Sequence, residues 1–276
     1  MTDNQEMPAA LSDVAVAKYG KTLWHALETR TPVAPLTDAE PGLAIADAYR
    51  IQLAMIAHRQ AATGETVIGK KIGVTSRAVM DMLDVRQPDF GHLLSGMVFG
   101  EGEALDVGTF ISPRAEGEIA FLLKKDLEGP GVSAADVLRA TEAVMPCFEI
   151  VDSRIRDWKI RIGDTVADNA SCGALVLGGL LTTPRALDLA TVGMTVEKNG
   201  EVVGTGAGAA ALGHPANAIA WLANTLGRLG LGLKAGEVVL SGALSALVPV
   251  TAGDALRVSI GGLGSVGVRF VGERNN

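Results

Sequence analysis

The sequence has few cysteines and few aromatic residues, and it has no excess of positive charge. Two cysteines, Cys147 and Cys172, are too few for a disulfide framework, and no Cys-x-x-Cys pair is present to bind zinc or exchange electrons. Lysine and arginine number 24 against 31 aspartates and glutamates, a net charge of −7, so no basic surface is expected to collect nucleic-acid phosphates. These absences predict a cytoplasmic protein that does not bind nucleic acid.

Long apolar runs are also missing. The most apolar tract, residues 230–250, is interrupted by Lys234, Glu237 and several glycines, so it falls short of the roughly 20 apolar residues that cross a bilayer. The N-terminus is acidic and lacks the basic start and apolar stretch of a secretory signal. We therefore expect neither membrane insertion nor export.

What the sequence does contain indicates a mixed α and β protein. Thirty-four glycines predict many tight turns and close backbone contacts. One helix is expected from about Leu11 to Thr29. A second is expected after a cap at residues 37–40, with its inward face formed by Ile45, Tyr49, Leu53 and Ile56 and its end at Gly64. We predict a helical N-terminal segment over residues 1–65 and a β-rich catalytic domain over residues 66–276.

Short alternating runs after residue 66 predict strands separated by Gly, Pro and Asn. Asn199-Gly200 separates two such runs and indicates a hairpin, since both residues tolerate the positive φ of a type I′ turn. Two helices are expected among the strands, one over about residues 133–143 and one that begins near His214-Pro215. The predicted strands cover residues 67–74, 118–123, 144–151, 194–203, 238–241, 256–260 and 266–270.

Three glutamates are candidates for a metal site. Glu116 and Glu118 stand two residues apart at the start of an apolar strand, so both carboxylates emerge on one face while Ile119 and Phe121 take the other. Glu149 lies in a second apolar strand, where a lone carboxylate is costly to bury. Mg²⁺ or Mn²⁺, which prefer oxygen ligands, would relieve the repulsion among three buried carboxylates.

The same glutamates have a second interpretation, a structural salt-bridge cluster that uses Arg114, Arg154 or Arg156. Spacing alone does not decide between the two, because residues 101 and 103 repeat the Glu-Gly-Glu pattern in a polar, loop-like segment where it is expected to be solvated. Guanidinium groups on the triad would argue against a metal.

Other polar residues allow two interpretations each. Strand alternation sends Lys70 and Lys71 to opposite faces, so one ammonium points inward, either to hold a substrate carboxylate or move a proton, or to reach a salt bridge. Asp89 is either a general base or part of an ordinary turn, and the residues alone favour the turn. Asp168-Asn169-Ala170-Ser171 is either a polar pocket wall or a helix cap.

Some apparent motifs are not expected to carry function. Residues 262–267 match the Gly-x-Gly-x-x-Gly dinucleotide pattern, but a strand pattern follows where a helix is needed to receive a pyrophosphate. The glycines at 204, 206 and 208 lack the Lys-Ser or Lys-Thr of a phosphate loop and are expected in a turn or at a close contact. The four histidines show no metal-pair spacing.

Five ordered motifs carry a family resemblance that covers nearly the whole chain. The sequence resembles the hydratase/decarboxylase family of aromatic meta-cleavage pathways, within the fumarylacetoacetate hydrolase superfamily. The motifs are Gly69-Lys70-Lys71-Ile72-Gly73-Val74-Thr75-Ser76, Gln87-Pro88-Asp89-Phe90-Gly91, Pro113-Arg114-Ala115-Glu116-Gly117-Glu118, Phe148-Glu149-Ile150-Val151-Asp152-Ser153-Arg154-Ile155-Arg156-Asp157-Trp158 and Val166-Ala167-Asp168-Asn169-Ala170-Ser171-Cys172-Gly173.

The resemblance implies a role for particular residues. It implies that Glu116, Glu118 and Glu149 ligate a divalent ion, usually Mg²⁺ or Mn²⁺. Lys71 matches the family's active-site lysine and Asp89 a pocket acid implicated in proton transfer, so both are predicted to be catalytic. Lys71 and Ser171 are predicted to contact the substrate. The implied fold is an α+β mixed β-sandwich roll with a helical N-terminal segment.

The implied activity is hydration of 2-hydroxypenta-2,4-dienoate to 4-hydroxy-2-oxopentanoate. The sister activity of the family is decarboxylation of 4-oxalocrotonate, and the presence of Asp89 favours hydration because the decarboxylases typically lack this acid. A non-catalytic oligomer that binds 2-oxo acids is the alternative of another class. The resemblance also implies a homo-oligomer built on pentamers and a possible complex with the decarboxylase.

Overall fold

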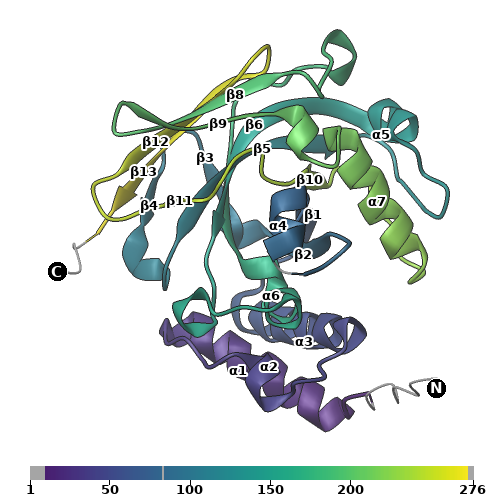
Figure 1. The fold of residues 1–276 in the computed structure, drawn as a ribbon, viewed down its shortest axis with the longest axis vertical. Helices are drawn as coiled ribbons and strands as arrows, with labels where there is room; N and C mark the ends of the chain where they lie inside the picture. The colour runs from purple at the N-terminus through teal and green to yellow at the C-terminus, as the bar shows by residue number, and fades with distance from the viewer. Residues whose placement is uncertain (1–9, 83, 273–276) are drawn as a thin grey trace.

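A computed structural model describes residues 10–82 and 84–272, which fold into two mixed sheets with helices at one end and along one side (Figure 1). Its helices are α1 (Asp13–Thr29), α2 (Leu36–Ala39), α3 (Ile45–Thr63), α4 (Arg77–Met82), α5 (Ala134–Ala140), α6 (Ile162–Ala167) and α7 (Pro215–Gly227). Short 3₁₀ turns cover Ser95–Met97, Val107–Thr109, Arg156–Trp158, Asn169–Ser171, Pro184–Ala186 and Gly208–Ala210. None of the helices in this part of the chain is long and apolar enough to cross a membrane.

Helices α1 and α3 lie together at the bottom of Figure 1 and confirm the helical start of the chain. Gly64 ends α3 in the left-handed conformation, at a φ of 75°, as predicted. The cap prediction was wrong, because residues 36–39 form the separate α2, and α3 follows Ala44, which makes no side-chain cap. Leu53 was also misplaced. It is 51% exposed, since the buried face of α3 runs through Ile51 and Met55 instead.

The larger sheet has eight strands in the order β2-β1-β10-β5-β6-β7-β3, with β11 paired to β5. Strands β1 and β10 are parallel, as are β3 and β7, and the other neighbours are antiparallel. The strands are β1 (Val67–Gly73), β2 (Asp89–Leu94), β3 (Val98–Gly100), β5 (Arg114–Leu123), β6 (Thr141–Val151), β7 (Cys172–Leu177), β10 (Val238–Leu240) and β11 (Val248–Pro249).

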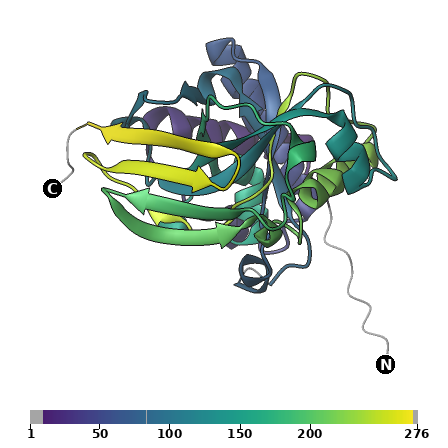
Figure 2. The same cartoon turned by 90° about the horizontal axis from the view of Figure 1, so that it is seen from above.

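The smaller sheet has five strands in the order β4-β13-β12-β8-β9, and β12, β13, β8 and β9 form the green and yellow layer of Figure 2. Asn199 and Gly200 join β8 to β9 with φ values of 55° and 87°, which confirms the predicted hairpin. The strands are β4 (Ala104–Asp106), β8 (Gly193–Lys198), β9 (Glu201–Ala207), β12 (Ala255–Ile260) and β13 (Gly264–Val271).

Strand β5 separates the hydrophobic core from the opposite face of the larger sheet. Ile119 and Phe121 are fully buried in the main core cluster with residues of the smaller sheet. A Cβ at Gly117 would lie 2.8 Å from the sulfur of Met194 in β8, so only glycine fits this contact between the sheets. Because side chains alternate along a strand, residues 116 and 118 point away from this core.

The sequence predicted most of the strands but missed several. The predicted strands at 67–74, 118–123, 144–151, 194–203, 238–241, 256–260 and 266–270 are all present, and β13 rather than a helix follows Gly262. Strands β2, β3, β4, β7 and β11 were not predicted, and α5 ends three residues earlier than expected because β6 begins at Thr141. The division of the chain into two domains at residue 65 stays a prediction.

Candidate active site

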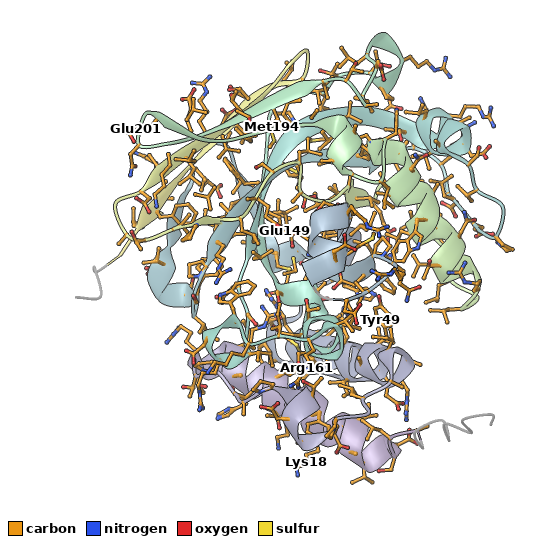
Figure 3. The ribbon with its side chains drawn as sticks, in the orientation of Figure 1. Lys18, Tyr49, Glu149, Arg161, Met194 and Glu201 are labelled. Atoms are coloured by element: carbon orange, nitrogen blue, oxygen red, sulfur yellow. The ribbon has the colours of Figure 1, made fainter. Side chains whose placement is uncertain are left out.

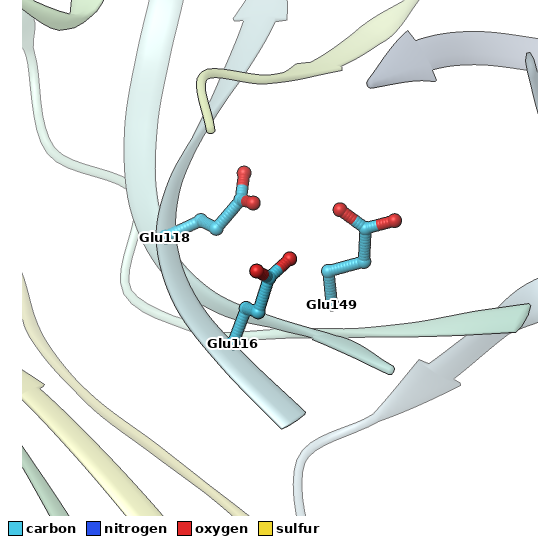
Figure 4. Close-up of side chains that lie close together, drawn as sticks. All are labelled: Glu116, Glu118 and Glu149. Carbon is cyan, nitrogen blue, oxygen red and sulfur yellow. The ribbon is translucent and has the colours of Figure 1, made fainter. Parts of the chain in front are cut away.

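The carboxylates of Glu116, Glu118 and Glu149 converge on one side of the larger sheet (Figure 4). Glu116 pairs directly with Glu149 across β5 and β6, and Glu118 follows two residues later on the same face. One carboxylate oxygen from each glutamate lies within 4.8 Å of the other two. The structure therefore brings together all three residues predicted to hold a metal.

The triad lacks the partners that three buried anions need. Like charges directly opposite each other destabilise a sheet, and Glu118 and Glu149 are completely buried. Glu118 Oε2 accepts a hydrogen bond from the Gly242 N–H at 2.8 Å. Glu118 Oε1 and Glu149 Oε2 have no hydrogen-bond partner among the described residues, and Glu149 Oε1 faces the Lys71 ammonium at 3.0 Å. Buried acceptor oxygens without donors fit a hard divalent cation.

Burial and mutual repulsion favour the protonated forms of Glu116 and Glu118 when no cation is present. Burial, together with the Glu149 carboxylate, raises the pKa of Glu116 to about 7 against the opposing effect of Lys71. The pKa of Glu118 rises well above its usual range for the same reasons, with Glu116 as a further neighbouring charge. The site therefore disfavours its own full ionisation, and a cation would offset this cost.

Lys71 is the positive charge at the site. Strand β1 carries it, and its Nζ lies 3.0 Å from Glu149 Oε1 in a pair that is almost completely buried. Burial alone would lower the pKa of the Lys71 ammonium, but Glu149, Asp89 and Glu116 outweigh it and raise this pKa. The ammonium therefore stays charged. The Lys70 side chain points to the opposite face of β1, as predicted, and its Nζ lies 2.8 Å from Glu237 Oε1.

Asp89 lies at the start of β2 and is 2% exposed, so the turn that its sequence favoured is wrong. A Cβ at Gly73 would lie 2.3 Å from Asp89 Oδ1 and 3.4 Å from Lys71 Nζ, which places both side-chain ends over the same glycine. Burial, with Glu149 adding to it, raises the pKa of Asp89 against the effect of Lys71. Neither carboxylate oxygen has a hydrogen-bond partner within the described residues. Asp89 is therefore a buried acid beside Lys71.

Ser171 ends a strained loop that faces β2. Asn169, Ala170 and Ser171 have φ values of 53°, 49° and 55°, a left-handed run that costs free energy in residues other than glycine. The Asn169 side chain holds the loop, because it accepts from the His92 N–H at 2.7 Å and donates to the His92 carbonyl at 2.9 Å. The Ser171 hydroxyl is buried and has no partner among the described residues. It is available to a ligand, as the pocket-wall interpretation requires.

The salt-bridge interpretation of the triad is wrong for all three arginines. Arg154 is completely buried and pairs with Asp168 at 2.5 Å, and it also donates to the Cys172 carbonyl at 3.0 Å. Arg114 lies over the Trp158 ring at 4.3 Å. Arg156 donates to the carbonyl of residue 32 at 3.3 Å. Arg154 thus joins both ends of the loop that carries Ser171 and leaves the glutamates free.

Sequence reasoning missed three polar side chains of this region. Tyr49 of α3 stacks on Phe90 with ring centroids 4.4 Å apart, and its hydroxyl accepts from the Phe90 N–H at 3.2 Å. The Ser241 hydroxyl, just after β10, is buried without a partner among the described residues. Asn169 was noted only as part of a polar run. For Ser241, the one sequence signal of a functional role was a serine at the end of an apolar strand. Tyr49 gave no such signal, because the helical pattern assigned its side chain to the inward face of the helix.

His92 gives the fold a dependence on pH that can be measured. Burial, helped by Lys70, lowers its pKa from 6.5 to about 4, and its Nδ1 lies 2.9 Å from Gln52 Oε1. Between pH 6.5 and pH 4 the His92 side chain is protonated in the unfolded chain but stays neutral in the folded one. The free energy of unfolding therefore decreases as the pH falls through this range. The loss is about 3 kcal/mol at most.

We expect His92→Gln to reduce this loss. The free energy of unfolding in urea, measured at pH 7 and pH 4.5, should fall less in the variant than in the parent. His25→Gln is the control, because the His25 side chain is 70% exposed. An equal fall in the parent and in His92→Gln would contradict the shifted pKa.

The fold and the site together define a two-sheet α+β protein with three converging carboxylates on one side of its larger sheet. Residues 71–271 match the family model described as fumarylacetoacetate (FAA) hydrolase C-terminal. The chain belongs to the fumarylacetoacetate hydrolase family. A 2-hydroxyhexa-2,4-dienoate hydratase of Comamonas testosteroni is 57% identical over 257 residues, 92% of this chain and 97% of that protein. A 2-hydroxypent-2,4-dienoate hydratase of Pseudomonas putida is 60% identical over 217 residues, 78% of this chain and 97% of that protein.

A solved structure agrees with this assignment. The 4-oxalocrotonate decarboxylase from Pseudomonas putida G7, complexed with magnesium and adipate, superposes with a TM-score of 0.91 at 37% identity. The match covers 95% of this chain and 99% of that one. The predicted fold, an α+β roll of the fumarylacetoacetate hydrolase type, is confirmed.

Proposed function

We propose that the protein hydrates 2-hydroxypenta-2,4-dienoate to 4-hydroxy-2-oxopentanoate in aromatic meta-cleavage catabolism, with Glu116, Glu118 and Glu149 as ligands of Mg²⁺ or Mn²⁺. The protein is a hydro-lyase of the hydratase group, two members of which match 92% and 78% of its length. The observation that carries the proposal is the convergence of three carboxylates, two of them with an unpartnered oxygen, beside Lys71 and Asp89. The substrates in the names of these two relatives differ by one carbon.

The metal would supply Lewis-acid stabilisation of negative charge on the substrate's carboxylate and C2 oxygen. The carboxylates at this site outnumber the one ammonium of Lys71 beside them, so these residues fit a divalent cation. A related decarboxylase is described with magnesium, which supports a divalent metal here.

Lys71 and Asp89 are proposed to bind the substrate carboxylate and to transfer protons, respectively. Because its ammonium stays charged, Lys71 would bind the substrate carboxylate rather than remove a proton. Asp89, whose pKa is raised by burial, would act as the acid at the far end of the substrate. The Ser171 hydroxyl would donate a hydrogen bond to a substrate oxygen.

The reaction needs two proton movements at carbon and one addition of water. The C2 hydroxyl of the dienol loses its proton to solvent water and C5 gains one from Asp89, which leaves a C3–C4 double bond conjugated with the 2-oxo group. This conjugation makes C4 electrophilic. The ionised Asp89 then takes a proton from water as the oxygen attacks C4, and C3 takes the last proton from solvent, in place of the one that the C2 hydroxyl released. The product contains one water more than the substrate.

The test follows the loss of dienol absorbance while the product is identified by mass. We expect a gain of 18 mass units, since hydration adds one water. Loss of carbon dioxide from 4-oxalocrotonate would instead assign the sister activity. Binding of 2-oxo acids without metal-dependent turnover would assign the non-catalytic alternative.

Asp89→Asn should abolish most of the hydration and leave metal binding intact. The amide keeps the size of the side chain but cannot donate and accept the proton, so we expect kcat to fall by on the order of 10²- to 10⁴-fold. Mn²⁺ binding, measured by calorimetry, should stay within a fewfold of the parent. Unchanged turnover would remove Asp89 from the mechanism.

The assembly and location are proposals of the same kind. We propose a homo-oligomer built on pentamers, a possible complex with 4-oxalocrotonate decarboxylase, and a cytoplasmic location. Sedimentation of the purified protein, alone and with the decarboxylase, tests the first two.

A further inference from the structure

A cavity of about 280 Å³ lies beside Asp89 and has no part in the chemistry described above. We refer to it as the tail cavity. Asp89 is one of its lining residues, so the cavity begins where the proposed proton donor stands. The metal triad is not among the residues that line it. A space at this place in the protein is open to whatever part of a substrate extends past Asp89.

The walls of the tail cavity are mainly apolar. Helix α3 contributes Ile45 and Tyr49, and α6 contributes Ile162 and Val166. The Tyr49 ring is fixed, because it stacks on Phe90 at an interplanar angle of 18° and its hydroxyl accepts from the Phe90 N–H. Figure 3 labels Tyr49 near the helical layer and Glu149 further into the molecule. Such a wall favours hydrocarbon over polar groups.

The basic residue at the cavity, Arg86, already has acidic partners. Arg86, which lines the cavity, lies 3.3 Å from Asp81 and 3.8 Å from Asp84, and it donates to the Val85 carbonyl at 3.1 Å. Its neighbours offset its charge, so the cavity offers little to a second substrate carboxylate. An uncharged tail suits these surroundings better than the distal carboxylate of a dicarboxylic acid.

The order of groups along the site sets the direction of the substrate. The cavity meets Asp89, the Asp89 and Lys71 side chains end over Gly73, and Lys71 pairs with Glu149 of the triad. If the substrate's carboxylate and C2 oxygen lie at the metal end, C5 reaches Asp89. Carbon atoms beyond C5 then have the tail cavity in front of them.

We infer that Ile45 is a specificity-determining residue, which sets how long an alkyl substituent on C5 of the dienoate the tail cavity accepts. This inference rests on the proposed hydratase function, whose relatives include a 2-hydroxyhexa-2,4-dienoate hydratase, and it adds the residue that limits the length of the tail. Ile45 is half-buried at the first turn of α3, so its side chain can be enlarged or shortened with little change to the core.

The test measures kcat/KM for 2-hydroxypenta-, hexa-, hepta- and octa-2,4-dienoate in the full-length protein with Mn²⁺. Ile45→Trp should lower the ratio of kcat/KM for octadienoate to that for pentadienoate at least tenfold, because one methylene in a pocket changes discrimination about 10- to 200-fold. Ile45→Ala should raise the same ratio. Leu53→Trp, on the exposed face of the same helix, should leave it unchanged.

Each outcome decides one question. A ratio that moves in opposite directions in the two Ile45 variants, with the Leu53 variant unchanged, supports the inference. A ratio that stays constant in Ile45→Trp and Ile45→Ala, while pentadienoate is still hydrated, overturns it and makes the cavity a packing void. If the parent protein does not hydrate pentadienoate at all, the proposed function fails instead. Should Ile45→Trp not fold, the change in Ile45→Ala alone decides.

Discussion

Glu118→Gln should abolish tight metal binding and lower turnover by on the order of 10³-fold while the fold remains intact. The side chain keeps its size, but one of the three carboxylates proposed to hold the metal becomes a neutral amide. We expect the affinity for Mn²⁺ to fall about 100-fold or more, since changes even outside the first ligand sphere cost 10- to 100-fold. Calorimetry with Mn²⁺ and the dienol assay measure both effects.

The chain contains a matched control for this variant. Glu103 ends an exposed Glu-Gly-Glu segment with the same spacing, so Glu103→Gln removes the same charge without touching the site. Without metal, Glu118→Gln should be at least as stable to urea as the parent, because it removes one of three mutually repelling carboxylates. Full activity of Glu118→Gln at low Mg²⁺ would contradict the proposal that the triad binds the metal.

Arg154→Met should lower the free energy of unfolding by about 3 to 5 kcal/mol, because it leaves the Asp168 carboxylate buried and uncompensated. Both partners of this pair are completely buried, and Arg154 also donates to the backbone carbonyls of Asp168 and Cys172, at the two ends of the Ser171 loop. Urea unfolding monitored by circular dichroism measures the loss. Adding Asp168→Asn to the same chain should recover part of it.

A surface pair serves as the comparison. Arg139→Met breaks the ion pair with Asp136, in which the Arg139 side chain is 66% exposed, and should cost less than about 1 kcal/mol. If Arg154→Met and Arg139→Met lose similar stability, the buried pair does not hold the loop.

The sequence predicted the triad because its signal is local. Glu116 and Glu118 interrupt an apolar alternating run, and Glu149 interrupts another, so burial and the shared face of the first two followed from the pattern. The direct pairing of Glu116 with Glu149 did not follow, because register between strands depends on contacts distant in sequence. The hydrogen bond from the Gly242 N–H to Glu118 could not be predicted either, because Gly242 follows a third strand, β10.

The misses have physical causes of the same kind. Strand β2 was hidden because Asp89 and His92 interrupt its apolar residues, and their neighbours Lys71 and Gln52 come from other elements. Leu53 fits the helical period, but the neighbours of α3 cover a face that is turned away from it. The left-handed run that ends at Ser171 is held by the hydrogen bonds of its Asn169 side chain to His92 and by Arg154, both distant in sequence. Tertiary contacts decide such positions.

Because the three carboxylates converge only when Glu116 pairs with Glu149, a bound ion would stabilise only the correct register of β5 and β6. If β5 slipped by one residue against β6, Gly117 would replace Glu116 opposite Glu149, and the two β5 glutamates would turn toward the apolar side. A mispaired sheet would then offer no site, so added Mn²⁺ would lower the free energy of the correctly aligned chain alone. Refolding yield should therefore increase with the concentration of the ion.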